Sequence, residues 1–330
     1  MLEDPKLDPD ALKAALRSAY GIEASAMAFV PGYDAHAATY RVDGADDRLF
    51  LKVRFDALRE ATLDVPAALL EAGVPNVLAP IRTQSSALWA PMEGRSIVLY
   101  PFVSGSNAMD AGMTEEQWRT FGTTLRAVHD SDLEGRFAGS LPTEAFSSAA
   151  SASAERMLAL AERTSFESVA ATRFADLLAT QAGRIGAMLM RFEELAGALR
   201  ERPLGRVLCH ADIHAANILV TDDGGIMLVD WDGPMLAPRE RDLLFVIGSR
   251  IARDVEPHEE AWFFAGYGDV AVDPDALIYY RYERVLEDIA EFASSVLLDD
   301  IQAEATRDGQ TQLVASFFAP GGILETAERV

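Results

Sequence analysis

The sequence predicts an α+β fold of two lobes, a small N-terminal lobe built on an antiparallel sheet and a larger helical C-terminal lobe. Short apolar runs typical of strands dominate the first hundred residues, whereas helical periodicity dominates the remainder. The 330 residues, 49% hydrophobic and 25% charged, exceed one small domain and can supply two separate cores. We therefore expect the N-terminal lobe over residues 1–100, a hinge over 101–106 and the C-terminal lobe over 107–330.

The N-terminal lobe is expected to start with a helix that leads into the sheet. Asp8 can cap this helix, Pro9 suits its first turn and Gly21 can end it. A second helix over residues 56–72 is expected to cross the sheet and to end at Gly73. The strands of the sheet should lie at residues 29–30, 39–42, 49–53, 77–81 and 96–100.

Beyond the hinge, helices are expected to alternate with a few short strands. Thr114 and Gln117 have the spacing of a capping box, so a helix should run from there to about His129. Residues 139–154 are rich in Ser and Ala and indicate a loop or a weak linker. Short strands are expected near residues 206–209, 218–220 and 227–229. The remaining helices should cover residues 155–163, 166–199, 240–253, 256–267, 274–298 and 309–318.

The composition restricts the partners and the compartment. A formal net charge of −23 repels nucleic-acid phosphates and anionic membranes but tolerates a cationic small molecule, although the charge can also serve solubility alone. The single Cys209 cannot form an internal disulfide and is expected in the core, which fits a reducing compartment. Because the N-terminal segment lacks a signal-peptide pattern and no apolar run reaches bilayer length, we expect a cytoplasmic protein without nucleic-acid or membrane partners.

Three oxygen-bearing side chains form the most informative pattern. Asp212 and Asn217 lie in a polar turn between two apolar runs, and Asp230 ends a third such run. Strand ends that flank one turn can converge, and two carboxylates with an amide oxygen suit Mg²⁺ far better than zinc. Phosphoryl transfer needs such a set, with one carboxylate to orient the hydroxyl and accept its proton. A turn cap is the alternative for Asp212 alone, but it leaves the joint spacing unexplained.

The spacing of these residues resembles a kinase catalytic loop. His210-Ala-Asp212 is followed by Asn217 at the usual distance, and Asp230-Trp-Asp resembles the metal-binding motif that comes next. The loop lacks the arginine that protein kinases carry beside this aspartate, and no Ala-Pro-Glu signature follows. In both respects the chain is similar to aminoglycoside phosphotransferases rather than to protein kinases.

Two longer runs extend the resemblance, since residues 229–243 and 279–288 resemble the spectinomycin phosphotransferase branch of that family. The resemblance implies a two-lobed, protein-kinase-like fold. It also implies that Asp212 is the catalytic base and that Mg²⁺ is held by Asn217 and Asp230. His210 would support the loop from behind.

A nucleotide site is implied in the N-terminal lobe. Lys52 lies in an apolar strand and resembles the lysine that reaches the α- and β-phosphates, with Glu60 as its ion-pair partner. The alternatives are a snorkelling lysine and a glutamate on a solvated helix face, with Glu71 a poorer partner. Residues 32–38, which contain Gly32 but lack the three glycines of protein kinases, are the candidate phosphate loop.

The segment after the last strand of this lobe resembles the interlobe linker. Its backbone at Tyr100, Phe102 and Val103 would bind the purine edge, unless the segment is a plain connector. Ile97 would provide an apolar wall, with Ile218 or Val229 opposite it. Side chains do not reveal backbone recognition, so ATP is preferred and GTP stays open.

Further residues are candidates for support and for substrate binding. Asp242 can hydrogen-bond to the catalytic loop, or it can be an ordinary charge at a helix start. His214 is expected to face solvent rather than the site, and Arg284 should lie beside Asp288 by helical spacing. One late helix carries acidic residues that form either a paired, solvated face or a carboxylate wall for an amine-bearing substrate; they are Glu283, Glu287, Asp288 and Glu291, of which Glu283 and Asp288 are the substrate candidates. Core packing is the expected role of Trp262, Tyr267 and Tyr279.

These observations favour one function over its alternatives. The resemblance implies transfer of the γ-phosphate of ATP, or GTP, to a hydroxyl of spectinomycin or a similar aminocyclitol, and with it antibiotic resistance. The first alternative is the same chemistry on choline, homoserine or a methylthio sugar. The second is a kinase-fold protein that binds nucleotide without catalysis, and the presence of all four of Lys52, Asp212, Asn217 and Asp230 argues against it. The sequence leaves the oligomeric state open.

Overall fold

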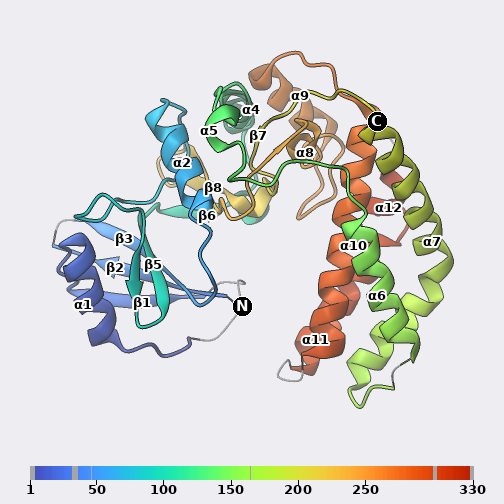
Figure 1. The fold of residues 1–330 in the computed structure, drawn as a ribbon, viewed down its shortest axis with the longest axis horizontal. Helices are drawn as coiled ribbons and strands as arrows, with labels where there is room; N and C mark the ends of the chain where they lie inside the picture. The colour runs from blue at the N-terminus through green and yellow to red at the C-terminus, as the bar shows by residue number, and fades with distance from the viewer. Residues whose placement is uncertain (1–3, 32–35, 46, 164, 300–302, 328–330) are drawn as a thin grey trace.

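The computed structural model describes residues 4–31, 36–45, 47–163, 165–299 and 303–327. Figure 1 shows an N-terminal sheet with two flanking helices beside a larger body of helices. The expected α+β class, with an antiparallel sheet followed by a helical remainder, is confirmed. None of the helices in these described ranges has the length and apolar character that a membrane span requires.

One antiparallel sheet forms the N-terminal part, with the strand order β1-β2-β3-β5-β4. Along β3, Leu51 and Val53 are buried under helix α1, so Lys52 and Arg54 lie on the opposite face of the sheet. The elements here are α1 (Pro9–Tyr20), β1 (Ala26–Val30), β2 (Ala37–Asp43), β3 (Arg48–Arg54), β4 (Ala90–Met92) and β5 (Arg95–Pro101). Helix α1 has the expected ends, an Asp8 cap and a left-handed Gly21 at φ 71°.

Helix α2 (Ala61–Glu71) joins the two parts of the molecule. Its Leu63 and Ala67 pack with β5, whereas Val65 and Leu69 belong to the core of the helical part. The helix begins five residues later than expected, because residues 56–60 form bends and a turn in which charged side chains bind partners outside any helix.

Two expectations for the N-terminal part are wrong. Residues 77–81 do not form a strand; Val77 makes an isolated bridge to Leu228, and the Ile81 N–H donates to Leu99 O, so this segment connects two sheets instead of lying in one. Strand β4 was not expected, because three residues that include Pro91 are too short to show a period.

Two small sheets carry the loops of the helical part. β7 (Val207–Cys209) pairs with β10 (Met235–Ala237), and β8 (Ile218–Thr221) lies between β6 (Gly105–Asn107) and β9 (Ile226–Leu228). The segment expected as a hinge therefore contains the end of β5, a linker at residues 102–104 and the start of β6. At Gly105 a Cβ atom would lie 2.2 Å from Val220 O, so the β6–β8 contact requires glycine here.

Helices complete the C-terminal part around one large core. α4 has the expected capping box at Thr114 and packs closely on α9, where a Cβ on Gly266 would lie 1.9 Å from Arg119 O. The longer helices are α4 (Glu115–His129), α6 (Ala149–Arg163), α7 (Val169–Arg200), α9 (Pro257–Tyr267), α10 (Pro274–Leu298) and α11 (Glu304–Phe317). The short ones are α3 (Ala108–Ala111), α5 (Glu134–Phe137), α8 (Glu240–Leu243), α12 (Ile323–Thr326) and the 3₁₀ turn η1 (Ala215–Asn217).

Two helix expectations need correction. Helix α6 starts inside the segment expected as a loop, because its small residues Ala150 and Ala154 pack into the core. The helix expected over 240–253 is confined to α8, followed by turns in which Gly248 takes the left-handed φ of 52° and ends regular structure. Helix α10 matches its expected range and runs past the loop between β7 and β8, where its Arg284 donates to Asp212.

Candidate active site

The loop between β7 and β8 holds a strained backbone turn. Ala211 has a φ of 69°, and Asp230 at the end of the neighbouring β9 segment has a φ of 62°. Residues other than glycine rarely adopt such angles, and when they do, the surrounding contacts must impose them. Here the strain falls next to Asp212 and on Asp230 itself, so both predicted functional carboxylates start from backbone positions that are held by their neighbours.

Asp242 supplies the contacts that hold the first of these turns. Its carboxylate is fully buried and accepts the N–H of His210 at 2.9 Å and that of Ala211 at 2.6 Å. His129 Nε2 lies 3.0 Å from it and His129 Nδ1 lies 2.7 Å from the Tyr267 hydroxyl, so a ring with its proton on Nε2 donates to the carboxylate and can accept from the tyrosine. Burial by itself would raise the pKa of Asp242, but the bond from His129 and the nearby charges outweigh it, so the pKa is lowered. The structure therefore supports the interpretation in which Asp242 hydrogen-bonds to the loop, and not the one in which it is an ordinary charge at a helix start.

His210 ties the loop to the segment that carries Asp230. Its Nε2 lies 2.9 Å from Val229 O, and its ring packs on Trp231 with the centroids 4.4 Å apart. If Nε2 carries the proton, Nδ1 can accept the Asp212 N–H at 3.4 Å, so one neutral tautomer satisfies both contacts. The side chain is buried behind the loop, as the resemblance implied.

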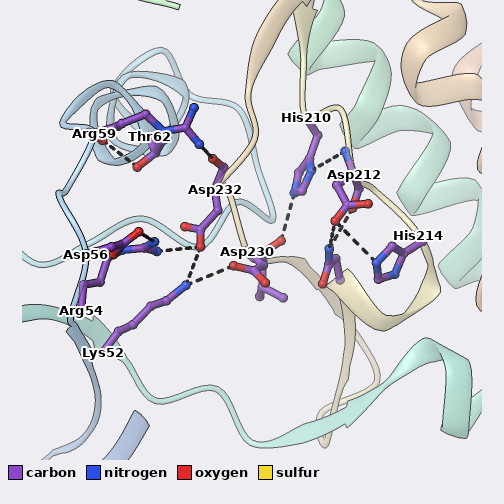
Figure 2. A network of polar contacts seen from close by, with 12 residues as sticks. Lys52, Arg54, Asp56, Arg59, Thr62, His210, Asp212, His214, Asp230 and Asp232 are labelled. Atoms are coloured by element: carbon purple, nitrogen blue, oxygen red, sulfur yellow. Dashed lines mark hydrogen bonds and ion pairs between the residues drawn. The ribbon is translucent and has the colours of Figure 1, made fainter. Parts of the chain in front are cut away.

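The structure brings the three predicted oxygen-bearing residues together, and two of them, Asp212 and Asp230, are labelled in Figure 2. Asn217 Nδ2 donates to Asp212 O at 2.8 Å and lies 3.4 Å from Asp212 Oδ2. The Val229 N–H donates to Asn217 O at 3.0 Å, which places the start of the Asp230 turn against η1. The two turns therefore form a single cluster.

Cations from β3 face this cluster across the interface between the two parts. Lys52 Nζ lies 2.8 Å from Asp232 Oδ2 and 3.3 Å from Asp230 Oδ1 (Figure 2). Burial alone would lower the pKa of the Lys52 ammonium, but the charges of Asp230 and Asp232 outweigh it, so the pKa is raised and the group stays charged. Arg54 Nη1 donates to Asp232 Oδ2 at 2.8 Å, and Arg59 Nη2 donates to Asp232 O at 3.0 Å.

Sequence reasoning missed Arg54 and Asp232 as members of this cluster. A signal was present for Arg54, because a strand places residues two apart on the same face, and Lys52 already pointed to that face as functional. Asp232 lay within the recognised Asp-Trp-Asp run, but no local rule assigned it a partner on β3.

Two of the residues predicted to contact the nucleotide, Glu60 and Phe102, have other partners in the structure. Glu60 does not pair with Lys52; because α2 starts after it, Glu60 lies at the helix entrance and accepts from Trp89 Nε1 at 3.0 Å. The Phe102 N–H donates to Arg48 O at 3.2 Å, so the predicted linker donor is already bound to β3. Tyr100 lies within β5 opposite Phe50, and Val103 is half-buried in the linker. The predicted Gly32 contact lies outside the described residues.

Two acidic residues of α10, Glu283 and Asp288, are paired as one interpretation expected but largely buried, whereas Glu287 and Glu291 are exposed. Glu283 forms an ion pair with Arg241 and accepts from the Tyr279 hydroxyl at 2.9 Å. Asp288 Oδ1 lies 3.0 Å from Arg284 Nε, the predicted neighbour at helical spacing. The solvated face is therefore wrong for these two residues, and Glu283 points to an internal partner. Tyr279 and Tyr267 are fully buried in the core, as expected.

Two residues beside Asp212 were undervalued or missed. Arg284 Nη1 donates to Asp212 Oδ1 at 2.7 Å. His214 was expected to face solvent, but its Nε2 lies 3.6 Å from Asp212 Oδ2 and its ring packs against Phe245. Burial lowers the pKa of His214 and favours the neutral imidazole.

The donor set suits a hard cation such as magnesium better than zinc. Asn217 uses its amide nitrogen toward Asp212, which leaves the amide oxygen facing the other way, and Asp230 is half exposed with one oxygen on Lys52. Two hard oxygen donors that leave room for water and phosphate match the coordination of Mg²⁺. The buried group of His129, Cys209 and Asp242 lies behind the loop and is already engaged in hydrogen bonds.

Comparisons with known proteins agree with this geometry. The model of a protein family described as "Phosphotransferase enzyme family" matches residues 30–280. Protein StrN of Streptomyces griseus is 28% identical over 202 residues, which cover 59% of this chain and 62% of StrN, less than two thirds of that relative.

Among solved structures, spectinomycin phosphotransferase APH(9)-Ia in complex with ADP and spectinomycin superposes with a TM-score of 0.88 and 29% identity over 98% of both chains. Its AMP-bound complex gives 0.86 and 28%, over 98% of this chain and 99% of that one. A choline/ethanolamine kinase family protein from Mesorhizobium loti, 14% identical with a TM-score of 0.54, covers 97% of this chain and 99% of its own and shares the fold alone. The kinase-like fold and the resemblance to aminoglycoside phosphotransferases are thereby confirmed. With more than half of its length matched by the family model, this chain belongs to the phosphotransferase enzyme family.

Proposed function

We propose that this enzyme transfers the γ-phosphate of ATP to a hydroxyl of an aminocyclitol, with spectinomycin as the first candidate. The proposal is carried by one observation: Asp212, Asn217, Asp230 and Lys52 meet at a single site. Similarity to a phosphotransferase whose structure contains ADP and spectinomycin supports the choice of nucleotide and acceptor. A role in antibiotic resistance inside the cytoplasm follows from the same proposal.

In the proposed reaction, Asp212 accepts a hydrogen bond from the acceptor hydroxyl and aims its oxygen at the γ-phosphorus. The O–H bond breaks as the new O–P bond forms, and the bond from the γ-phosphorus to the bridging oxygen breaks, so that ADP leaves with that electron pair. Asp212 takes the proton and releases it to solvent after the products leave. Because the transition state is loose, position matters more here than the strength of the base.

The cations of β3 would bind the phosphates. Lys52 is charged and held at the cluster, and we propose that it contacts the α- and β-phosphates while Arg54 adds a second positive charge. Asn217 and Asp230 would hold Mg²⁺, which offsets phosphate charge when bound. We propose that residues 101–106 act as the hinge between lobes 1–100 and 107–330. Since the Phe102 N–H is engaged, the purine edge would use the backbone of Val103, and GTP remains an alternative nucleotide.

A substrate panel with γ-labelled ATP tests this proposal. Purified enzyme is incubated with spectinomycin, other aminocyclitols and aminoglycosides, choline, homoserine and a methylthio sugar, and labelled product is counted. We expect spectinomycin or a related aminocyclitol to give the highest kcat/KM. Turnover of one of the metabolites without turnover of any aminocyclitol would replace the substrate class while keeping the reaction. Nucleotide binding with no turnover of any acceptor or of water would support the non-catalytic alternative.

A further inference from the structure

Helix α10 presents a guanidinium to the proposed base from outside the catalytic loop. Arg284 Nη1 lies 2.7 Å from Asp212 Oδ1, and Arg284 Nε lies 3.0 Å from Asp288 Oδ1, one helical turn further on. The guanidinium also lies 5.9 Å from the centre of the Phe245 ring. Arg284 Nε makes no hydrogen bond at this distance, so the charge attraction to Asp288, the hydrogen bond to Asp212 and the contact with the ring together hold the group.

This contact makes the two oxygens of Asp212 inequivalent. Oδ1 accepts a short, charge-assisted bond from Arg284, whereas the neighbours of Oδ2 are more distant, Asn217 Nδ2 at 3.4 Å and His214 Nε2 at 3.6 Å. Neither of these distances is that of a strong hydrogen bond. Oδ2 is therefore the oxygen with the capacity to accept a hydroxyl proton, and Oδ1 is the oxygen that is held.

The support behind Arg284 is rigid. Helix α10 has 25 residues and is packed against α6, α7, α8 and α11, so its side chains have a stable base. Burial alone would lower the pKa of the Arg284 guanidinium, but the charges of Asp288 and Asp212 outweigh it, so the group is always charged. A planar fork can touch both carboxylates at once, which the compact ammonium of lysine cannot do with the same geometry.

We propose that Arg284, oriented by Asp288, is a positioning residue that holds Asp212 Oδ1 and thereby turns Oδ2 toward the acceptor hydroxyl. The proposal rests on the proposed function, because it assigns the orientation of the base in that reaction. The proposed site then extends beyond the catalytic loop and the metal-binding motif. It includes a row of three ion-paired side chains, Asp288, Arg284 and Asp212. Arg284 itself takes no proton and makes no bond in the reaction.

The chain offers a matched control for this row of ion-paired side chains. Arg202 also bridges two carboxylates, those of Asp273 and Asp275 at the start of α10, with Nη1 lying 3.1 Å from Asp275 Oδ2. Within the described residues, no contact of Arg202 involves the proposed site. Arg202→Ala therefore removes a comparable ion-pair bridge on the same helix without touching Asp212.

The test compares Arg284→Ala, Arg284→Lys, Asp288→Asn and Arg202→Ala with the parent enzyme, using any acceptor that the panel yields. We expect Arg284→Ala to lower kcat about 100-fold while KM for ATP stays within about twofold, because a base displaced by a fraction of an ångström loses its alignment. Asp288→Asn should lower kcat about tenfold and Arg284→Lys by an intermediate factor, whereas Arg202→Ala should leave kcat within about twofold. Millimolar guanidinium chloride should raise the kcat of Arg284→Ala at least about tenfold, because the free cation can bind where the Arg284 guanidinium lies in the parent.

A kcat for Arg284→Ala within about threefold of the parent would overturn the proposal. So would a loss that guanidinium does not restore in a variant whose thermal unfolding matches the parent, since that loss would not come from the missing cation. If Arg284→Ala does not fold, Arg284→Lys and Asp288→Asn carry the same comparison. The outcome is separate from the proposed acceptor, because it depends on the ratio of variant to parent. Hydrolysis of ATP, with water beside Asp212, gives that ratio if no acceptor in the panel reacts.

Discussion

The proposed phosphate side (Lys52, Asp230 and Asp232) and the proposed acceptor side (Asp212, Arg284 and Asp288) both consist of cation–carboxylate pairs, but they differ in their supports and in the burial of one carboxylate, Asp288. On the phosphate side, Lys52 is 12% exposed and contacts Asp230 and Asp232, whose side chains are 49% and 41% exposed and come from the opposite part of the molecule. On the acceptor side, Arg284 and Asp288 are 23% and 16% exposed and belong to one helix, and Asp212, the other partner of Arg284, is 38% exposed.

This difference matches what each side has to do. Half-exposed carboxylates that reach Lys52 across the two parts of the molecule can be hydrated again when the pair separates, so we expect these pairs to exchange partners when a triphosphate arrives. Pairs that are buried on one rigid helix cost more to separate and therefore suit a fixed alignment. We therefore expect Lys52 to exchange its carboxylate contacts for phosphate contacts during each turnover, while Arg284 keeps its contacts with Asp212 and Asp288.

Replacing Asp212, the proposed base, should lower kcat more than any other change considered. Asp212→Asn keeps the shape of the side chain but removes its ability to take a proton, so kcat should fall about 1,000-fold. Isothermal titration with ADP should still show binding close to that of the parent, because the phosphate side is intact. Turnover at the parental rate would show that another group orients the hydroxyl.

The second prediction concerns the binding of ATP by Lys52 on the proposed phosphate side. Lys52→Met removes a charge from the cluster, so kcat/KM for ATP should fall about 100-fold, with a clear rise in KM for the nucleotide. The matched control is Arg82→Ala, which removes an exposed ion pair with Glu71 in the same part of the chain and should have no effect on KM. An unchanged nucleotide KM in Lys52→Met would mean that phosphate binding does not depend on this pair.

A third change acts on the support of the catalytic loop. Asp242→Asn turns an amide N–H₂ or a weaker acceptor toward the buried donors of His129, His210 and Ala211, so the free energy of unfolding should fall by about 2–3 kcal/mol. Urea unfolding measures this loss. Asp254→Asn, which breaks an exposed pair with Arg250, is the control and should cost less than about 0.5 kcal/mol. Equal stability of the two variants would contradict the bracing role of Asp242.

The sequence was informative where the site is local. Asp212, Asn217 and Asp230 lie within one short stretch of strand, turn and strand, so their convergence follows from the local chain path. The capping box of α4 and the Gly21 end of α1 are local as well, and both were predicted correctly. The three-residue strands β7 and β9 were expected from their apolar runs, whereas β6 and β10 were not, because Gly105-Ser-Asn has no apolar run and Met235-Leu-Ala lies between two prolines.

Long-range contacts explain the remaining differences. Arg284 lies 72 positions after Asp212, and no spacing rule states that α10 passes the catalytic loop. The partner of Lys52 was assigned to Glu60 by resemblance, but the late start of α2 moves Glu60 away, and the carboxylates of Asp230 and Asp232 take its place. Packing of the two parts against each other decides such pairs, and that packing is a property of the whole fold.

The last prediction tests whether the acceptor side is as buried as the comparison requires. Burial raises the pKa of Asp288 to about 6, more than the charge of Arg284 lowers it, and the nearby Glu291 and Glu287 also raise it. Between the ordinary pKa of about 4 and this value, the folded state binds more protons than the unfolded state, so stability should fall as the pH rises through that window and level off above it.

Urea unfolding at pH 4.5 and at pH 7 should therefore show a decrease for the parent that exceeds the decrease for Asp288→Asn by on the order of 2 kcal/mol. Glu115→Gln, which removes an exposed carboxylate paired with Arg119, controls for the general loss of charge. If the parent and Asp288→Asn show the same pH dependence, Asp288 is as well solvated as the carboxylates of the phosphate side, and the contrast between a side that exchanges its contacts and a side that keeps them loses its physical basis.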